Sequence, residues 1–467
     1  MKIRILPALV TGVMVTTALL SSCLKSDYAD FDYPAESSIK SFSIGTLHQT
    51  IYGKSSKGED SIYTDTVSYA HIPFTIDQIN RRIYNKDSLP KDVDITRVVT
   101  SITADNAGIY YVKDNKDTLW TSTDSIDFTN EVTFKVWAYS ELQNQYIPGK
   151  PYTVKINVHK LNPDSLVWAH FGDKKFAEGV TFTEEKAVYL NEHIYVFGNT
   201  EAKETKVFKA NVVKGSISAW ENVPFDQQGM NIYSATAFNN DIYYVAGGKL
   251  YTLDGGNEVG NLSGLTNLIC VSNGKLLAYK GEGNLVIEIN SDGTVSDIEG
   301  TPFEIGYNLS GRLSAYSAPS SHNESLWRTV VMTNNESTAE NDTTANVFSY
   351  LTYDEKWVKF QPNNPTTCPN QANISMISYD GKLFAYGEEF DYFYSSTDNG
   401  LNWKKEDGYM IFPSENKNGI DKLTTYRDGG CYSSVVESNA NESAFIWFIW
   451  KDGSLTRVHL NRLLPKN

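Results

Sequence analysis

The chain has 467 residues, with 41 Lys+Arg against 56 Asp+Glu and a formal net charge of −15. Nucleic-acid binding needs a basic surface, and so does adsorption to anionic lipids through a polybasic segment, so this charge argues against both. The chain is too long for one ordinary domain, and its 29 Tyr, 21 Phe and 9 Trp are ample material for hydrophobic cores.

The N-terminus has the pattern of an export signal. Lys2 and Arg4 precede a mostly apolar stretch, residues 5–20, which has the length of a signal-peptide core and is too short to span a membrane. Two serines and Cys23 follow, in the order and spacing of the lipobox of bacterial lipoproteins. This resemblance implies a lipoprotein signal peptide at 1–22 and lipidation of the Cys23 thiol. The alternative is an ordinary secretory signal that contains a cysteine.

The same resemblance predicts the location of the mature protein. Leu24 stands where many lipoproteins of the inner membrane have an aspartate, so we expect an outer-membrane lipoprotein of the cell envelope, facing the periplasm or the cell surface. Its lipid anchor would be its link to the membrane, because no second apolar run is long enough to span a bilayer. Residues 23–38 are acidic with little to bury, which predicts a flexible tether.

Three cysteines follow Cys23, namely Cys270, Cys368 and Cys431. An odd number cannot all pair, and their spacing fits neither a disulfide framework nor a zinc site. We expect buried small hydrophobes, with one disulfide left open for an oxidising compartment. No two histidines lie three or four positions apart and no phosphate-binding loop occurs, so the sequence predicts neither a metal nor a cofactor.

Residues 39–160 alternate short strand patterns with polar turns. The clearest patterns are residues 108–112, 133–138 and 152–158, and long apolar helical periodicity is hard to find. Several short strands in succession predict an immunoglobulin-like β-sandwich, although the cysteine pair of antibody-type domains is absent.

Residues 161–467 repeat one unit imperfectly. Each copy is an apolar strand, a tight polar turn and a second apolar strand, which predicts a β-hairpin buried on both faces; the copies are 187–198, 237–248, 270–279 and 377–387. Several hairpins are followed by a further strand and a tryptophan: Trp220, Trp357 and Trp403. This arrangement resembles the blades of kelch-type β-propellers. A spacing of roughly 50 residues implies six blades, and one short interval leaves seven as the alternative.

The last unit lacks an outer strand, because the chain stops soon after residues 455–460. A strand pattern that contains Trp168, residues 165–171, stands at the start of the repeat region instead. We predict that this strand joins the C-terminal blade, since closing the ring in this way pairs edges that would otherwise be exposed.

One turn matches the Asp-box, S-x-D-x-G-x-x-W, with Ser396, Asp398, Gly400 and Trp403. In that motif the aspartate accepts backbone N–H bonds, the glycine permits a positive φ, and the tryptophan packs under the hairpin. These four residues are therefore predicted to be structural, not catalytic.

The whole chain resembles a family of lipoproteins of unknown function from Bacteroides-type bacteria. The matching features are the lipobox, an I-x-N-x-D-S-L-P segment at 83–90, a P-D-S-L-x-W junction at 163–168 and an L-N-R-L ending at 460–463. The resemblance implies an N-terminal immunoglobulin-like domain before a kelch-like propeller, and it carries no activity over.

Sialidases are propellers with Asp-boxes, so a sialidase-like, glycoside-processing enzyme is one alternative. That chemistry needs three arginines on the sugar carboxylate, a tyrosine nucleophile and a glutamate base. The F/Y-R-I-P motif of sialidases is absent. The propeller nevertheless offers five arginines: Arg312, Arg328, Arg427, Arg457 and Arg462.

The favoured function is a non-catalytic binding protein for a glycan or a protein partner. No nucleophile elbow or metalloprotease motif occurs, so no catalytic residue is assigned. Propellers bind ligands at the mouth of the central channel, where tyrosine and tryptophan stack on sugars and anchor partners. A pair of channel carboxylates about 5–10 Å apart would favour the enzyme instead.

Overall fold

The computed structural model describes residues 37–54, 60–104, 108–140, 142–160, 162, 164–296, 299–320, 323–336, 343–360, 366–414, 420–439 and 442–463. The chain forms two compact units that divide between Asn162 and Pro163. Both consist of β-strands with little helix, which confirms the all-β prediction. The expected signal peptide, Cys23 and all but the last two residues of the expected tether lie outside the described residues. No helix in the described ranges is long and apolar enough to cross a membrane.

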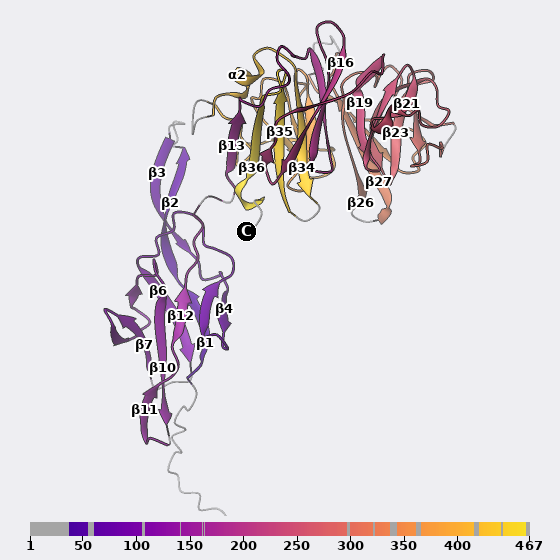
Figure 1. The fold of residues 1–467 in the computed structure, drawn as a ribbon. Coiled ribbons are helices and arrows are strands. Elements are labelled where there is room, and N and C mark those ends of the chain that lie inside the picture. The colour runs from indigo at the N-terminus through magenta and orange to yellow at the C-terminus, as the bar shows by residue number, and fades with distance from the viewer. Residues whose placement is uncertain are drawn as a thin grey trace, which may run out of the picture. The chain divides into compact units, whose positions relative to one another are not determined.

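The N-terminal unit has two sheets and a separate hairpin (Figure 1). The first sheet has the order β1 (Ile39–Ile44), β6 (Val98–Ala104), β9 (Ser125–Ile126). The second has the order β4 (Phe74–Asp77), β5 (Arg82–Asn85), β12 (Tyr152–Lys155), β10 (Val132–Ser140), β7 (Gly108–Lys113), β8 (Lys116–Leu119), with β11 (Gln145–Pro148) also on β10. The hairpin is β2 (Thr46–Lys54) with β3 (Asp60–Ser68).

Both sheets contribute to one core. Residues on β10 alternate between buried and part-buried, as expected for a strand with one face inward. Phe134 on β10 lies 6.4 Å, between ring centres, from Phe42 on β1, and Tyr152 is fully buried among the same residues. Two sheets with their inner faces packed together form a sandwich. All ladders here are antiparallel except the one between β5 and β12.

The I-x-N-x-D-S-L-P segment is structural. Asn85 is fully buried and exchanges hydrogen bonds with Asn157: each side-chain amide contacts the backbone of the other residue at 2.6–2.8 Å. Leu89 is also buried, and its backbone pairs with Asn157 and His159. These bonds satisfy the backbone where two segments run parallel, so this motif stabilises the domain.

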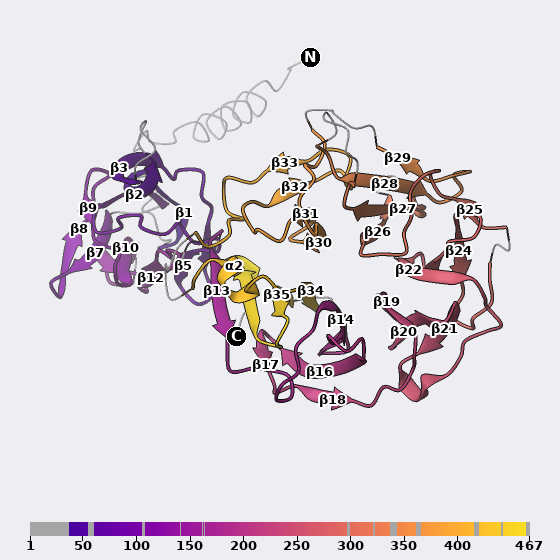
Figure 2. The same cartoon turned by 90° about the horizontal axis from the view of Figure 1, so that it is seen from above.

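The second unit contains six sheets in its described residues, arranged as a ring (Figure 2). Three of them are β14 (Glu184–Leu190), β15 (His193–Asn199), β16 (Thr205–Val213), β17 (Ser216–Ile217) with β18 (Glu221–Val223); β19 (Met230–Phe238), β20 (Asp241–Ala246), β21 (Lys249–Thr252); and β22 (Leu265–Ser272), β23 (Lys275–Lys280), β24 (Leu285–Ile289), β25 (Thr301–Pro302). The other three are β26 (Ser314–Ser320), β27 (Asn323–Thr333), β28 (Asn346–Leu351), β29 (Val358–Lys359); β30 (Ser375–Tyr379), β31 (Lys382–Tyr386), β32 (Tyr394–Ser396), β33 (Lys404–Lys405); and β34 (Tyr432–Asn439), β35 (Glu442–Trp450), β36 (Leu455–Leu460), β13 (Leu166–Phe171). Short helical pieces are η1 (Asp254–Gly256), α2 (Leu423–Arg427) and η2 (Asn461–Leu463).

The repeated hairpins predicted from the sequence are the first two strands of these sheets. Four have two-residue turns with positive φ at both positions: 191–192, 239–240, 273–274 and 380–381. This is the turn whose twist matches paired strands, and Asn-Gly and Asp-Gly suit it because Asn, Asp and Gly tolerate positive φ. The second strands are buried on both faces, as in β20 and β35.

The predicted closing strand is confirmed. Residues Leu166 to Phe171 of β13 pair antiparallel with Leu460 to Leu455 of β36, so the start of the unit completes its last sheet. The two terminal motifs meet there, because Asn461 bonds to Ser165 through both its backbone N–H and its side chain, 296 positions away in sequence. The ends of the repeat region are therefore held together by non-covalent pairing.

The tryptophans of the outer strands pack toward the preceding sheet of the ring. Trp357 and Trp403 lie in clusters shared with the preceding sheet, and Trp220 donates to the Gly453 carbonyl oxygen in the turn between β35 and β36 (2.7 Å). Trp168 on β13 packs in the same way among residues of β31. Among the described residues, six hydrophobic clusters fill the six spaces between neighbouring sheets, and four of them contain one of these tryptophans.

Candidate functional site

A cavity of about 320 Å³ lies among the innermost strands of the ring. Its lining comes from β14, β19, β22, β26, β30 and β34, together with the segment just before β26. The lining residues of β14, β26, β30 and β34 stand near the starts of their strands, whereas those of β19 and β22 stand in the middle and second half of theirs. The central channel is where a propeller gathers side chains from every blade.

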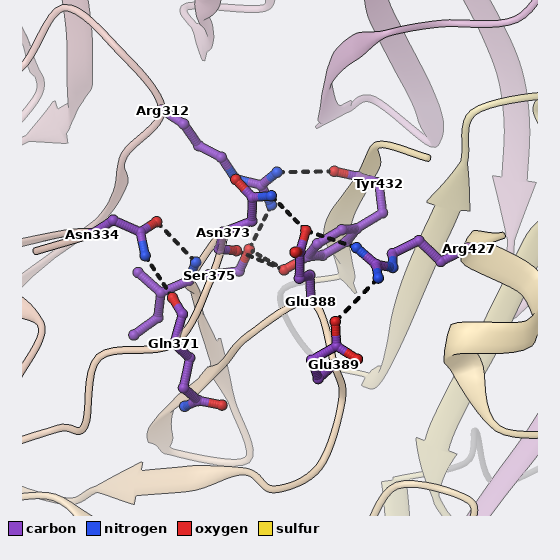
Figure 3. Close-up of polar contacts among 10 residues, drawn as sticks. Arg312, Asn334, Gln371, Asn373, Ser375, Glu388, Glu389, Arg427 and Tyr432 are labelled. Carbon is purple, nitrogen blue, oxygen red and sulfur yellow. Dashed lines mark hydrogen bonds and ion pairs between the residues drawn. The ribbon is translucent and has the colours of Figure 1, made fainter. Parts of the chain in front are cut away.

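Arg312 lines this cavity. Figure 3 shows the polar contacts that hold its side chain. Its Nη1 donates to the Tyr432 carbonyl oxygen (3.2 Å) and its Nη2 to the Ser375 hydroxyl (2.8 Å). Its guanidinium carbon lies 4.6 Å from the centre of the Tyr432 ring, a cation–π contact. The Tyr432 hydroxyl donates to the Asn373 carbonyl oxygen (2.8 Å), so the ring that supports Arg312 is itself fixed.

A second row of polar contacts lies beside Tyr432 (Figure 3). Asn373 Nδ2 donates to Glu388 (2.5 Å), and Glu388 pairs with Arg427 Nη1 (2.8 Å). Arg427 also pairs with Glu389 (3.2 Å) and is the last residue of α2. These pairs tie α2 to the segment after β31, so Arg427 supports the wall and does not face the cavity.

The segment that carries Arg312 is fixed by two asparagines of neighbouring inner strands. Asn231 on β19 donates to the Ser310 carbonyl oxygen (2.8 Å). Asn267 on β22 is fully buried and donates to the carbonyl oxygens of Leu309 (2.6 Å) and Gly311 (2.9 Å). Both lie at bulges in their strands, where a side chain can be aimed away from the regular ladder.

Glu185 is the only carboxylate among the residues that line the cavity. It is 2% exposed, and neither side-chain oxygen has a hydrogen-bond partner among the described residues. The neighbouring Cys431 thiol donates instead to the Phe182 carbonyl oxygen (3.2 Å). Burial raises the pKa of Glu185 to about 8, an effect that Cys431 and Arg312 partly offset. Glu185 is therefore protonated at pH 7.

Lys186, the next residue on β14, also lines the cavity. Its Nζ donates to the Tyr233 carbonyl oxygen (2.5 Å). Burial lowers the pKa of Lys186 to about 8, which leaves the ammonium mostly charged at pH 7. Burial also raises the pKa of the Cys270 thiol to about 12, so this cysteine is not a thiolate nucleophile.

The arginines named in the sequence do not converge. Only Arg312 lines the cavity, whereas Arg328 donates to Ser349, Arg457 to the Gly215 carbonyl oxygen, and Arg462 pairs with Asp164 and Asp380. The lining residues also lack the two carboxylates that most glycoside hydrolases use.

The Asp-box lies at the turn between β32 and β33. Burial by itself raises the pKa of Asp398, but hydrogen bonds from Asn402 and Ser396 outweigh it, so the pKa falls below the usual value. Gly400 has φ 84°, and the indole N–H of Trp403, 5% exposed, donates to its carbonyl oxygen (2.9 Å). All four predicted residues serve this turn, away from the central cavity.

A second hollow, of about 380 Å³, lies at the sheets that contain β22–β25 and β26–β29. Two of its three acidic residues have structural partners: Glu288 pairs with Lys275 (2.6 Å), and Asp354 accepts from the Leu351 N–H (3.0 Å). Tyr353, 82% exposed, is a surface residue of this hollow.

The cavity residues Glu185, Lys186 and Arg312 were not singled out together from the sequence. One signal was available, because Glu185 and Lys186 are charged residues at the start of a hairpin strand that is otherwise apolar. The three cysteines are free thiols, with Cys368 fully buried. No cluster that could hold a metal ion occurs among the described residues.

Comparison with solved structures finds distant likenesses. A protein of unknown function from Bacteroides thetaiotaomicron covers 92% of this chain and 99% of its own, at 10% identity and a TM-score of 0.40. An α-L-arabinanase from Penicillium chrysogenum covers 64% of this chain and 99% of its own, at 10% identity and a TM-score of 0.37. The Fusarium graminearum α-L-arabinofuranosidase Arb93A covers 64% and 99%, at 12% identity and a TM-score of 0.35.

No curated protein matches the chain. Two family models do: the DUF6242 N-terminal domain, a domain of unknown function, matches residues 42–156, and the DUF6242 β-propeller domain matches residues 162–467. The chain therefore belongs to the DUF6242 family, with the N-terminal domain of that family followed by its β-propeller domain.

Proposed function

We propose that this protein is a cell-envelope lipoprotein whose propeller binds a glycan or a protein partner, without catalysis, at its central cavity. The observation that carries the proposal is the cavity itself. Its lining is drawn from all six sheets and mixes polar with apolar side chains, with Arg312 held in a fixed orientation and a single carboxyl group. A fixed polar group in a concave site gives a ligand orientation and specificity.

Envelope anchoring rests on the lipobox. We expect the substitution Cys23→Ala to remove the acylated thiol and move the protein from the membrane fraction to the soluble fraction, because the net charge of −15 offers no electrostatic alternative for holding an anionic membrane. Fractionation and metabolic labelling with a fatty acid would measure this. A Cys23→Ala protein that still sediments with membranes would refute the lipid anchor.

The binding role is tested with the mature lipidated protein in detergent, on a glycan array and in pull-downs from envelope extracts. We expect a saturable ligand whose binding is weakened at least about tenfold in Arg312→Gln and kept in Tyr353→Ala, a change in the second hollow. Each glycan that binds is then incubated with the protein, and reducing ends are measured over time. Release of sugar that depends on a cavity residue would replace the binding role with an enzyme.

A further inference from the structure

We infer that the central cavity takes a ligand of sugar size that carries an oxyanion, specifically the carboxylate of an acidic sugar, and that Lys186 and Arg312 bind this group. The inference rests on the proposed binding function and names the ligand class of the same site. Two features support it: the charge balance of the cavity, and the donors that its lining leaves unused.

The charge balance favours an anion. Among the residues that line the cavity, Lys186 and Arg312 are the cations and Glu185 is the carboxyl group. At pH 7 Glu185 is protonated and Lys186 mostly charged, which leaves two positive charges without a counter-ion inside a hollow. Positive charge that is partly removed from water attracts anions more strongly than the same charge on an open surface. The cavity is therefore locally positive in an acidic chain.

Unused donors point to an acceptor. Two N–H groups of Arg312 donate to Tyr432 and Ser375 among the described residues, and a guanidinium has five. The ammonium of Lys186 has three N–H groups, and Tyr233 accepts one of them. A planar guanidinium with free N–H groups matches a carboxylate with two parallel hydrogen bonds.

The serines of the lining are donors as well. Ser314 Oγ accepts from the Met376 N–H (3.0 Å) and Ser433 Oγ accepts from the Ala187 N–H (2.6 Å). A hydroxyl whose oxygen accepts a backbone N–H still has its own O–H to donate. Both hydroxyls line the cavity, so they supply neutral donors beside the cations, as the hydroxyls and carboxylate of a sugar acid require.

Glu185 does not oppose this charge. Its carboxyl group is buried and its two oxygens are covered by the protein, so it does not contact a ligand in the cavity. In the protonated form it carries no negative charge that would repel an oxyanion. The volume of about 320 Å³ is at the low end of ligand pockets, which suits one sugar ring better than a long chain.

Calorimetry with matched sugars tests this inference. The titrants are the methyl glycosides of glucuronate and galacturonate, with those of glucose and galactose as neutral counterparts and a sulfated galactoside to separate carboxylate from sulfate. We expect the uronates to bind at least about tenfold more tightly than the neutral sugars at pH 7, the scale of one hydrogen bond to a charged group. Above pH 8 the affinity should fall, because Glu185 becomes an anion and Lys186 loses its proton.

Lys186→Gln should weaken uronate binding about tenfold and leave neutral sugars unaffected, and Tyr353→Ala should change neither. Arg312→Gln should have the same effect on uronate binding. Its melting temperature is measured first, because the substitution removes two structural hydrogen bonds. If Arg312→Gln unfolds, the result for Lys186→Gln tests the inference. Equal affinity for uronates and neutral sugars, or no uronate binding, would overturn the inference. If a neutral glycan or a protein binds and the cavity variants abolish it, the proposed function survives without the oxyanion. If neither an array ligand nor a pull-down partner depends on the cavity, the proposed function fails as well.

Discussion

Replacing residues 166–171 with a Gly/Ser sequence of the same length is expected to destabilise the propeller strongly. These residues form β13, which pairs along its whole length with β36, the strand that follows β35 at the end of the chain. The replacement keeps the connection between the two units and removes only the side chains and β-propensity of the closing strand. It therefore exposes the edge of β36 and leaves its outward-facing backbone groups to water.

The side chains of β13 carry part of this effect. Trp168 packs against Phe412 and Phe448, with ring centres about 6 Å apart, and Phe171 lies 5.7 Å from Trp447. His170 stacks on Tyr426 of α2 at 3.8 Å. Removing a large core aromatic costs about 3–5 kcal/mol when it is fully buried, and somewhat less here because β13 is only part-buried. At about 2–4 °C for each kcal/mol, we expect the melting temperature to fall by several degrees or more.

Differential scanning calorimetry of the full chain measures this, since the two units can unfold separately. The matched control replaces Glu201, Ala202 and Lys203 with Gly and Ser, because these exposed residues lie in the turn between β15 and β16 and pack against nothing buried. The control should leave the propeller transition within about 1 °C, in line with surface substitutions. An unchanged transition after the β13 replacement would mean that the ring does not depend on its closing strand.

Glu185→Gln is expected to stabilise the propeller at neutral pH. The unfolded carboxyl has a pKa of 4.5, and burial raises it to about 8 in the folded protein. A raised pKa means that this group favours the folded state most below pH 4.5, and that the contribution is lost as the pH rises toward 8. At pH 7 the loss is of order 3 kcal/mol, at about 1.4 kcal/mol per pH unit. Glutamine is neutral at every pH and avoids it.

Urea unfolding of both proteins between pH 4 and pH 8 gives the difference directly. We expect the two free energies of unfolding to be close near pH 4, where both side chains are neutral, and the Gln variant to gain about 3 kcal/mol relative to the parent between pH 4 and pH 7. Lys186 is present in both proteins, so its own titration cancels in the difference. Glu184→Gln is the control, since Glu184 is the exposed neighbour on β14 and should give a small, pH-independent difference. A constant difference between Glu185→Gln and the parent would show that Glu185 titrates normally.

The sequence by itself predicted the all-β class, the hairpin repeat and the closing of the ring by residues 165–171. Those predictions rest on local rules. Turn residues such as Asn273-Gly274 select a hairpin turn, apolar runs predict doubly buried strands, and a repeat without its outer strand must find one elsewhere. The pairing of two strands in a hairpin and the alternation of side chains along a strand depend on residues that are close together in the sequence. Both can therefore be recognised without tertiary contacts.

The cavity was decided by the tertiary structure. Glu185, Lys186 and Arg312 come from two separate segments, and only the ring brings the inner strands of all six sheets around one cavity. The pKa shifts of Glu185 and Lys186 arise from burial, which cannot be predicted from the local sequence. The arginines show the same limit: five looked equivalent in the sequence, and packing assigned four of them to partners elsewhere and one to the cavity. Charge and spacing are local properties, whereas desolvation and convergence depend on which strands the fold places side by side.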